Sequence, residues 1–207
     1  YLNRIRERRL TEAHVREAIR KATQTREVIL EGAVGAGTGM SAYHFKGGIG
    51  TASRIMELDE SYVLGALVLT NFGKRKDLMI QGQPVGIRVT ELEAQGSMHC
   101  EVKGPEKGSV IVILGTDLPL SERQLKRIAR RSVIGLSRTG SYLGNGSGDV
   151  VLAFSTANQT LHFQQEYFTN WQILQEDKMD IPFRAVAEAV EEAVLNSMVA
   201  AETVIGR

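Results

Sequence analysis

The 207-residue sequence is short of cysteine, of aromatic residues and of net charge. Its one cysteine, Cys100, excludes an internal disulfide and suits a reducing compartment such as the cytoplasm. A formal charge of +1 provides no strong field for nucleic acid or for an anionic membrane surface. No apolar run approaches the about 20 residues that a membrane helix needs. We therefore expect no nucleic-acid partner and no membrane partner.

Sequence motifs for nucleotides and metals are also missing. In the glycine tract EGAVGAGTGMSAYHFKGGIG, Lys46 precedes Gly47 and Gly48, which is the wrong order for a phosphate loop. A dinucleotide fingerprint would need a glycine where Met40 stands. The histidines are scattered, with no partner at metal-ligand spacing: His14, His44, His99 and His162. The sequence therefore predicts no cofactor and no metal.

Periodicity and capping residues predict one domain of mixed α and β structure over residues 1–207. Helices are expected at Leu10–Thr23, at Glu122–Arg131 with Ser121 as its cap, and at Pro182–Thr203. Strands are expected at Val28–Glu31, Ser61–Asn71, Ile87–Thr90, His99–Val102, Ser109–Gly115, Val150–Thr156 and Gln164–Leu174. Strand clusters between a first and a last helix favour sheets covered by helices, in the α+β class.

The stretch SYLGNGSGDVVLAFSTAN places Ser147 between two glycines just before an apolar strand. An ordinary turn explains these residue types. The other hypothesis is an N-terminal nucleophile: the chain cuts itself before a serine, and the freed α-amino group, of pKa about 7.7–8.0, becomes the base for the hydroxyl. Gly146 is small and pliable before such a cut, and Asn145 is available to hold the scissile carbonyl. Local sequence leaves both hypotheses open.

Five blocks of the sequence, in order, carry a family resemblance. They are GAGTGMSAYHFKGGIGTASR, GALVLTNFGKR, GSVIVILGTDLPLSERQLKRIARR, GNGSGDVVLAFSTAN and EEAVLNSMVAAE. From about Leu10 to Glu202 the sequence resembles the L-aminopeptidase D-Ala-esterase/amidases and β-peptidyl aminopeptidases, with nylon-oligomer hydrolases as more distant relatives. The resemblance implies a four-layer αββα sandwich, part of it expected outside this chain. It also implies self-cleavage between Gly146 and Ser147 into chains 1–146 and 147–207 that stay together.

The resemblance assigns roles to individual residues. Ser147 matches the nucleophile, and Tyr43 matches an active-site tyrosine that steadies charge near it; the alternative for Tyr43 is a core aromatic. Asn71, an amide at a strand end, is our candidate oxyanion donor, with a simple turn residue as the alternative. The family's Ser-x-acid pair, which orients the new amine, matches Ala189 and Glu191, so the serine is replaced. A solvated glutamate is the alternative for Glu191.

Other residues near these blocks have simpler expected roles. Gly47 and Gly48 are expected to let the backbone approach the substrate pocket. Asp149 either braces the free amine or caps the glycine turn. Asp117 is expected to cap the turn before the helix that starts after Ser121.

The implied function is an aminopeptidase or amidase that releases N-terminal residues from short peptides, amides or esters with a free N-terminus, through an acyl-enzyme on Ser147. One alternative is an amide-oligomer hydrolase of the nylon-oligomer type, although that relative uses threonine as its nucleophile. The other is a family member that does not process itself and serves as a binding or scaffold protein. The resemblance further implies a cytoplasmic homo-oligomer, a tetramer.

Overall fold

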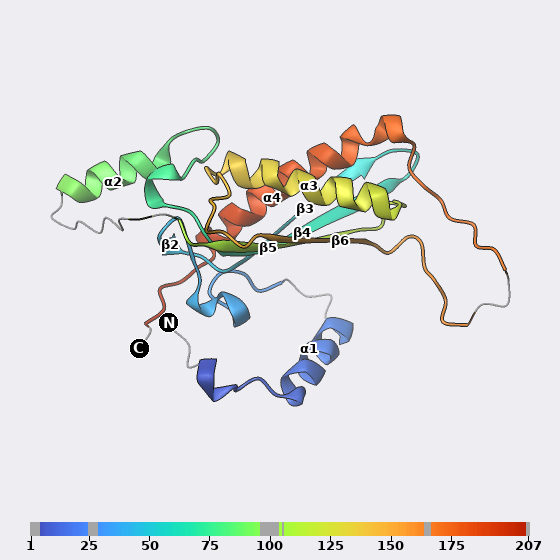
Figure 1. Ribbon diagram of the computed structural model, residues 1–207, viewed down its shortest axis with the longest axis horizontal. Helices are drawn as coiled ribbons and strands as arrows, with labels where there is room; N and C mark the ends of the chain where they lie inside the picture. Colours follow the sequence, from blue (N-terminus) through green and yellow to red (C-terminus); the bar gives the residue numbers. More distant parts are fainter. Residues whose placement is uncertain (1–4, 25–28, 96–103, 105, 164–166, 206–207) are drawn as a thin grey trace.

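The computed structural model describes residues 5–24, 29–95, 104, 106–163 and 167–205 (Figure 1). At its centre lies a four-stranded sheet in the order β3-β4-β5-β6. The strands are β3 (Ile49–Glu57), β4 (Ser61–Asn71), β5 (Ser109–Thr116) and β6 (Val150–Ser155). The first three pair antiparallel, and β6 runs parallel to β5. A parallel pair needs a long crossover, and a helix between β5 and β6 provides it.

Two helices, α3 (Glu122–Arg138) and α4 (Asp180–Val199), cover one face of this sheet (Figure 1). α4 packs on β3 and β4, and α3 packs on β6 and on α4. α3 begins with a capping box, in which the Ser121 hydroxyl accepts the Gln124 N–H and the Gln124 side chain accepts the Ser121 N–H. Among the described residues, no helix has both the length and the apolar character needed to cross a membrane.

The core lies between the sheet and the helices and follows from strand alternation. In β4, Leu64, Ala66 and Val68 face the helices and are buried. The alternate residues of the strands face the other way and include six exposed large apolar side chains: Ile55, Val63, Ile111, Val150, Leu152 and Phe154. A face with so much exposed apolar surface is typical of a surface that packs against another layer.

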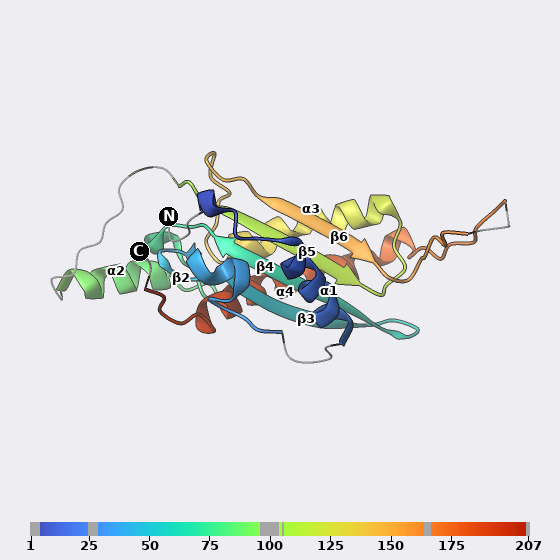
Figure 2. The ribbon, with the colours of Figure 1, turned by 90° about the horizontal axis from the view of Figure 1, so that it is seen from below.

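The helix α1 (Glu12–Gln24) lies on this second side of the sheet but does not cover it (Figures 1 and 2). It has no buried residue, and Val15 and Ile19 are 59% and 60% exposed. The described residues therefore supply one sheet and one covering helical layer.

The remaining elements are short or peripheral. They are α2 (Val85–Gln95), the two-stranded sheet of β1 (Ser41–Ala42) and β2 (Phe45–Lys46), and the 3-10 turns η1 (Ile5–Glu7), η2 (Gly35–Gly39), η3 (Arg75–Asp77) and η4 (Glu176–Lys178).

Several predicted elements are confirmed. The strand at Ser61–Asn71 matches β4, and the strands predicted near 109–115 and 150–156 match β5 and β6 within one residue. The three predicted helices match α1, α3 and α4, although α3 continues to Arg138 and α4 ends at Val199.

Other predicted strands are wrong. Ile87–Thr90 lies inside α2, which starts directly after Pro84, a residue that suits the start of a helix. The described part of Gln164–Leu174, residues 167–174, forms no strand, and neither do residues 29–31 of Val28–Glu31. The strand predicted at His99–Val102, with Cys100, lies outside the described residues. The sequence pattern also missed β3, which starts within the glycine tract.

Replacing Gly50 by alanine is expected to lower the free energy of unfolding by about 1–3 kcal/mol, the usual cost of overpacking. A Cβ at Gly50 would overlap the carbonyl oxygen of Ala193, so α4 would have to move away from β3. The matched control is Gly65→Ala in β4, where an added Cβ meets its nearest atom, the Gly115 oxygen, at 3.9 Å. Denaturant unfolding followed by circular dichroism measures both, and equal stability of the two variants would contradict this packing.

Candidate active site

One end of the sheet gathers most of the residues that the sequence singled out. Asn71 ends β4 directly opposite Ser109, the first residue of β5. The turn before β6 reaches the same place, because the Gly148 N–H donates to the Ser109 hydroxyl over 3.2 Å. Ser147, in the turn before β6, and Asn71, at the end of β4, therefore lie at the same end of the sheet, on either side of β5.

Hydrogen bonds on both sides of Ser147 fix its position. Its hydroxyl donates to Oδ1 of Asp149 over 2.6 Å, and its N–H donates to the Gly144 carbonyl over 2.8 Å. The same Oδ1 of Asp149 accepts the Val110 N–H of β5 over 3.2 Å. Asp149 thus caps the turn, as one of its two interpretations predicted, and aims the serine hydroxyl.

The glycines before Ser147 are needed because the turn lies directly on Glu106. A Cβ on Gly146 would come within 2.5 Å of the Glu106 carbonyl oxygen. A Cβ on Gly144 would come within 3.1 Å of the Glu106 carboxylate oxygen Oε2. The peptide bond between Gly146 and Ser147 is therefore held close to the segment that leads into β5.

Tyr43 is fully buried behind this edge. Its N–H donates to the Phe72 carbonyl over 2.8 Å, next to Asn71. Its hydroxyl lies 2.8 Å from the hydroxyl of Thr139, which in turn donates to the Leu136 carbonyl. Burial raises the pKa of Tyr43 well above its usual value, so the phenol keeps its proton. The tyrosine joins the end of β4 to the end of α3, from which the chain leads to Ser147.

A pocket of about 410 Å³ opens at the same edge of the sheet. It is lined by Ser41, His44, Asn71, Phe72, Gly73, Lys74, Gly104, Glu106, Lys107 and Gly108. Asn71 is exposed there, and its Oδ1 accepts the Ser41 N–H over 3.4 Å. Burial, followed by the charges of Arg75 and Lys74, lowers the pKa of His44, which is therefore neutral near pH 7.

Gly47 and Gly48 lie behind this pocket and do not line it. Both are buried, and the Gly48 N–H donates to the Thr70 hydroxyl over 3.1 Å. The Thr70 hydroxyl also lies 3.0 Å from that of Ser197 on α4. This buried polar network fixes the glycine tract beneath the strand end that carries Asn71.

Lys46, the lysine of the glycine tract, binds backbone carbonyls of that same tract. Its ammonium donates to the carbonyls of Gly37, Met40 and Gly47 over 2.7–3.0 Å. Burial lowers the pKa of this lysine. The side chain thus closes the tract on itself.

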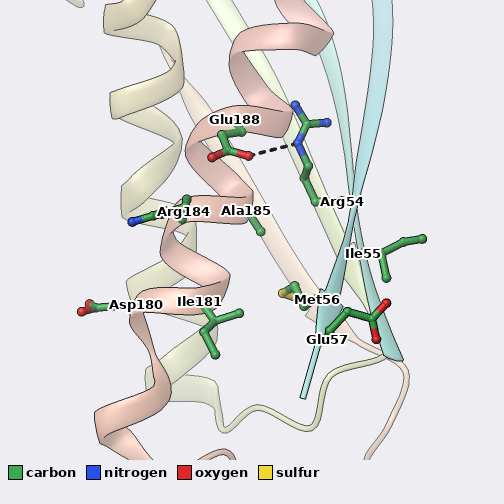
Figure 3. A pocket seen from close by; sticks show the side chains of 9 residues that line it. All are labelled: Arg54, Ile55, Met56, Glu57, Asp180, Ile181, Arg184, Ala185 and Glu188. Carbon is green, nitrogen blue, oxygen red and sulfur yellow. Dashed lines mark hydrogen bonds and ion pairs between the residues drawn. The ribbon is translucent and has the colours of Figure 1, made fainter. Parts of the chain in front are cut away.

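A second pocket, of about 330 Å³, lies between the far end of β3 and α4 (Figure 3). Arg54 points across it to α4 and pairs with Glu188 over 3.3 Å and with Glu192 over 2.6 Å. The candidate active site is at the other end of β3, where Ile49 pairs with Leu69, two residues before Asn71. This pocket is therefore separate from the candidate active site.

Comparisons with known proteins show the family of the chain. The model of peptidase family S58 matches residues 1–207. The chain belongs to peptidase family S58. Two proteins named beta-peptidyl aminopeptidase BapA, from Sphingosinicella microcystinivorans and Sphingosinicella xenopeptidilytica, are 41% and 40% identical to this S58 chain. Each match covers 86% of the chain and 47% or 46% of the relative, so the chain spans about half the length of the curated relatives it matches.

Solved structures resemble the S58 chain equally well, each with a TM-score of 0.83. The PH0078 protein from Pyrococcus horikoshii OT3 is 48% identical, and the match covers 98% of this chain and 53% of that one. The L-aminopeptidase D-Ala-esterase/amidase from Ochrobactrum anthropi, described as a variant of the Ntn hydrolase fold, is 42% identical, over 97% and 52%. A Burkholderia beta-aminopeptidase is 36% identical, over 99% and 56%. The α+β sandwich class is therefore confirmed.

Among the described residues, Glu191 forms no hydrogen bond or ion pair with another predicted site residue. It is on α4 and pairs with Arg138 of α3 over 3.2 Å. Ala189, where the resemblance expects serine, is fully buried in the helix pair. None of the contacts made by the described residues joins Glu191 to Ser147, and its role in orienting an amine stays a prediction.

Asp117 requires a correction. Its carboxylate accepts the Val63 N–H of β4 over 2.7 Å, so it binds the neighbouring strand and does not cap the turn before Ser121. The backbone N–H of Val63 needs an acceptor, and the Asp117 carboxylate provides it.

Tyr43→Phe is expected to lower the free energy of unfolding by about 0.5–1.5 kcal/mol, the usual contribution of one buried hydrogen bond. The substitution removes the hydroxyl that binds Thr139 and leaves the ring in place. Tyr167→Phe is the control, because that side chain is 98% exposed. Thermal unfolding measures the difference, and an unchanged midpoint for Tyr43→Phe would contradict the role of this bond.

Proposed function

We propose that this S58 chain carries the cleavage site and the nucleophile of a self-processing aminopeptidase or amidase, both at Ser147. The observation that carries the proposal is the position of Ser147, held by Asp149 at the start of β6 and preceded by a glycine turn pressed against Glu106. The relatives are named as aminopeptidases and an amidase, which supports the same activity.

Self-cleavage begins with the Ser147 hydroxyl. Its oxygen attacks the carbonyl carbon of Gly146, the peptide C–N bond breaks, and the acyl group moves from nitrogen to oxygen to give an ester. Asp149, already hydrogen-bonded to the hydroxyl, accepts its proton during the attack and returns it to the Ser147 nitrogen as the C–N bond breaks. Water then hydrolyses the ester, leaving a carboxylate on Gly146 and a free α-amine on Ser147.

The same serine then acts on substrate. The free α-amine takes the proton from its own hydroxyl as the oxygen attacks the carbonyl of the substrate's N-terminal residue. The amine leaving group departs, an acyl-enzyme remains on Ser147, and water releases the amino acid. Asn71, exposed in the pocket at the same edge, is the proposed oxyanion donor. Tyr43 is proposed to position Asn71 through its bond to Phe72.

The proposed substrates are short peptides, amides or esters with a free N-terminus. The pocket of about 410 Å³ is large enough for one or two small residues. A cytoplasmic homo-oligomer, the assembly implied by the resemblance, remains our proposal for the working state.

Ser147→Ala is expected to abolish hydrolysis. It removes the oxygen that attacks the substrate, and it also prevents the self-cleavage that frees the α-amine base. The assay measures products released from dipeptides, β-peptide amides and their N-acetylated forms. We expect the unaltered protein to cleave only substrates with a free N-terminus. Ser137→Ala, at an exposed position on α3, is the control and should keep full activity.

Three results would contradict the proposal. Unchanged hydrolysis by Ser147→Ala would exclude this serine as the nucleophile. Equal cleavage of free and acetylated substrates would favour an amide-oligomer hydrolase. Hydrolysis of none of the substrates by the unaltered protein would favour a binding or scaffold protein.

A further inference from the structure

Glu106 is a buried acid that forms no ion pair with any residue that the structure describes. The residue is 7% exposed, and one carboxylate oxygen, Oε1, accepts the Gly73 N–H over 2.7 Å. The other oxygen, Oε2, is also buried, and no hydrogen bond of good geometry reaches it from the described residues. The Tyr142 phenol approaches the Glu106 carboxylate: burial, the charges of Glu106 and Asp77 and a weak side-chain contact with Glu106 raise the pKa of that phenol.

A buried carboxylate is costly unless a cation or several donors satisfy it. Lys74 and Lys107 line the same pocket, yet within the described part of the chain neither forms an ion pair with Glu106. Arg54 in the second pocket shows the contrast, because two glutamates satisfy its charge. An acid that is left unpaired in a pocket is typical of a functional site.

The free oxygen of Glu106 lies beneath the turn that carries the nucleophile. Gly144 approaches Oε2 so closely that an added Cβ would be 3.1 Å away, and the Gly144 carbonyl accepts the N–H of Ser147. Glu106 also lines the pocket that contains Asn71. A cation bound at Oε2 would therefore lie beside the turn that leads to Ser147, at the wall of the pocket that contains Asn71.

We infer that Glu106 binds the free α-ammonium group of the substrate through Oε2. The inference rests on the proposed function and names the residue that recognises its substrate class. An aminopeptidase substrate carries a primary ammonium next to the scissile carbonyl, and an ammonium group donates charge-assisted hydrogen bonds to a carboxylate. Oε2 lies under the turn of Gly144, so the inference requires that cleavage after Gly146, which makes this turn a chain end, uncovers the oxygen.

The test uses the full-length protein and a pair of ligands that cannot be hydrolysed. One is a ketomethylene dipeptide analogue with a free α-ammonium, and the other is the same molecule without the amino group. Calorimetry measures the affinity of both for the unaltered protein, for Glu106→Gln and for the control Glu60→Gln, in the exposed turn between β3 and β4. Glutamine keeps an oxygen that can accept the Gly73 N–H, so the variant tests the charge.

The unaltered protein and Glu60→Gln are expected to prefer the ammonium ligand by about 10- to 100-fold, the usual effect of a charged hydrogen bond. Glu106→Gln should bind the two ligands with about equal affinity, and its affinity for the ligand without the amino group should match that of the unaltered protein. If Glu106→Gln does not fold, Gly144→Ala replaces it, because the methyl group would crowd Oε2 and should reduce the same preference.

Each outcome separates this inference from the proposed function. A preference that survives in Glu106→Gln or Gly144→Ala, or no preference in the unaltered protein, would overturn the role of Glu106. A preference that depends on Glu106 in a protein without hydrolytic activity would support this inference and contradict the proposed function. If Glu106→Gln lowers the affinity for both ligands equally, Glu106 has a structural role and the inference is overturned.

Discussion

One carboxylate oxygen, Oδ1 of Asp149, fixes Ser147 relative to the sheet. It accepts both the Ser147 hydroxyl and the Val110 N–H, so it joins the turn before β6 to the first residues of β5. The parallel pairing of β5 and β6 begins one residue after Asp149, at Val150 opposite Ile111. If this carboxylate were removed, the serine would lose its orientation, and the start of β6 would lose one of its ties to β5.

The rest of the candidate site depends on the same edge. β4 pairs with β5 in a register that places Asn71 opposite Ser109, so the oxyanion donor that we propose is fixed by backbone pairing and not by a flexible loop. Glu106 lies just before β5 and meets the turn of Gly144 and Gly146. The site is therefore built from the ends of three neighbouring strands.

The sequence predicts much of this arrangement, and the reasons are local. The alternation in Ser61–Asn71 and the cap at Ser121 lie within single elements, so β4 and α3 could be predicted without knowledge of the fold. β3 was missed because its first residues lie at the end of the glycine tract, and Gly50 is needed there for contact with Ala193 of α4, which is distant in the sequence. The family resemblance favours Ser147 as the nucleophile, whereas its turn-like surroundings leave both interpretations open.

Glu106 and Glu191 show what local sequence does not contain. The environment of Glu106 comes from Gly73 and Gly144, each more than thirty residues away, and a single glutamate between proline and lysine gives no sign of it. The resemblance matched Glu191 to an acid that orients an amine, but nothing in the local sequence predicts Arg138 of α3 as its partner. Both environments are set by tertiary packing.

The most direct test of this account is the intact mass of the freshly purified protein under denaturing conditions. The account predicts two pieces, one of which starts at Ser147, and a single uncut chain for Ser147→Ala. A single chain that stays uncut on long incubation of the unaltered protein would contradict the claim that Ser147 becomes an N-terminal nucleophile. Cleavage at a different bond would contradict it equally.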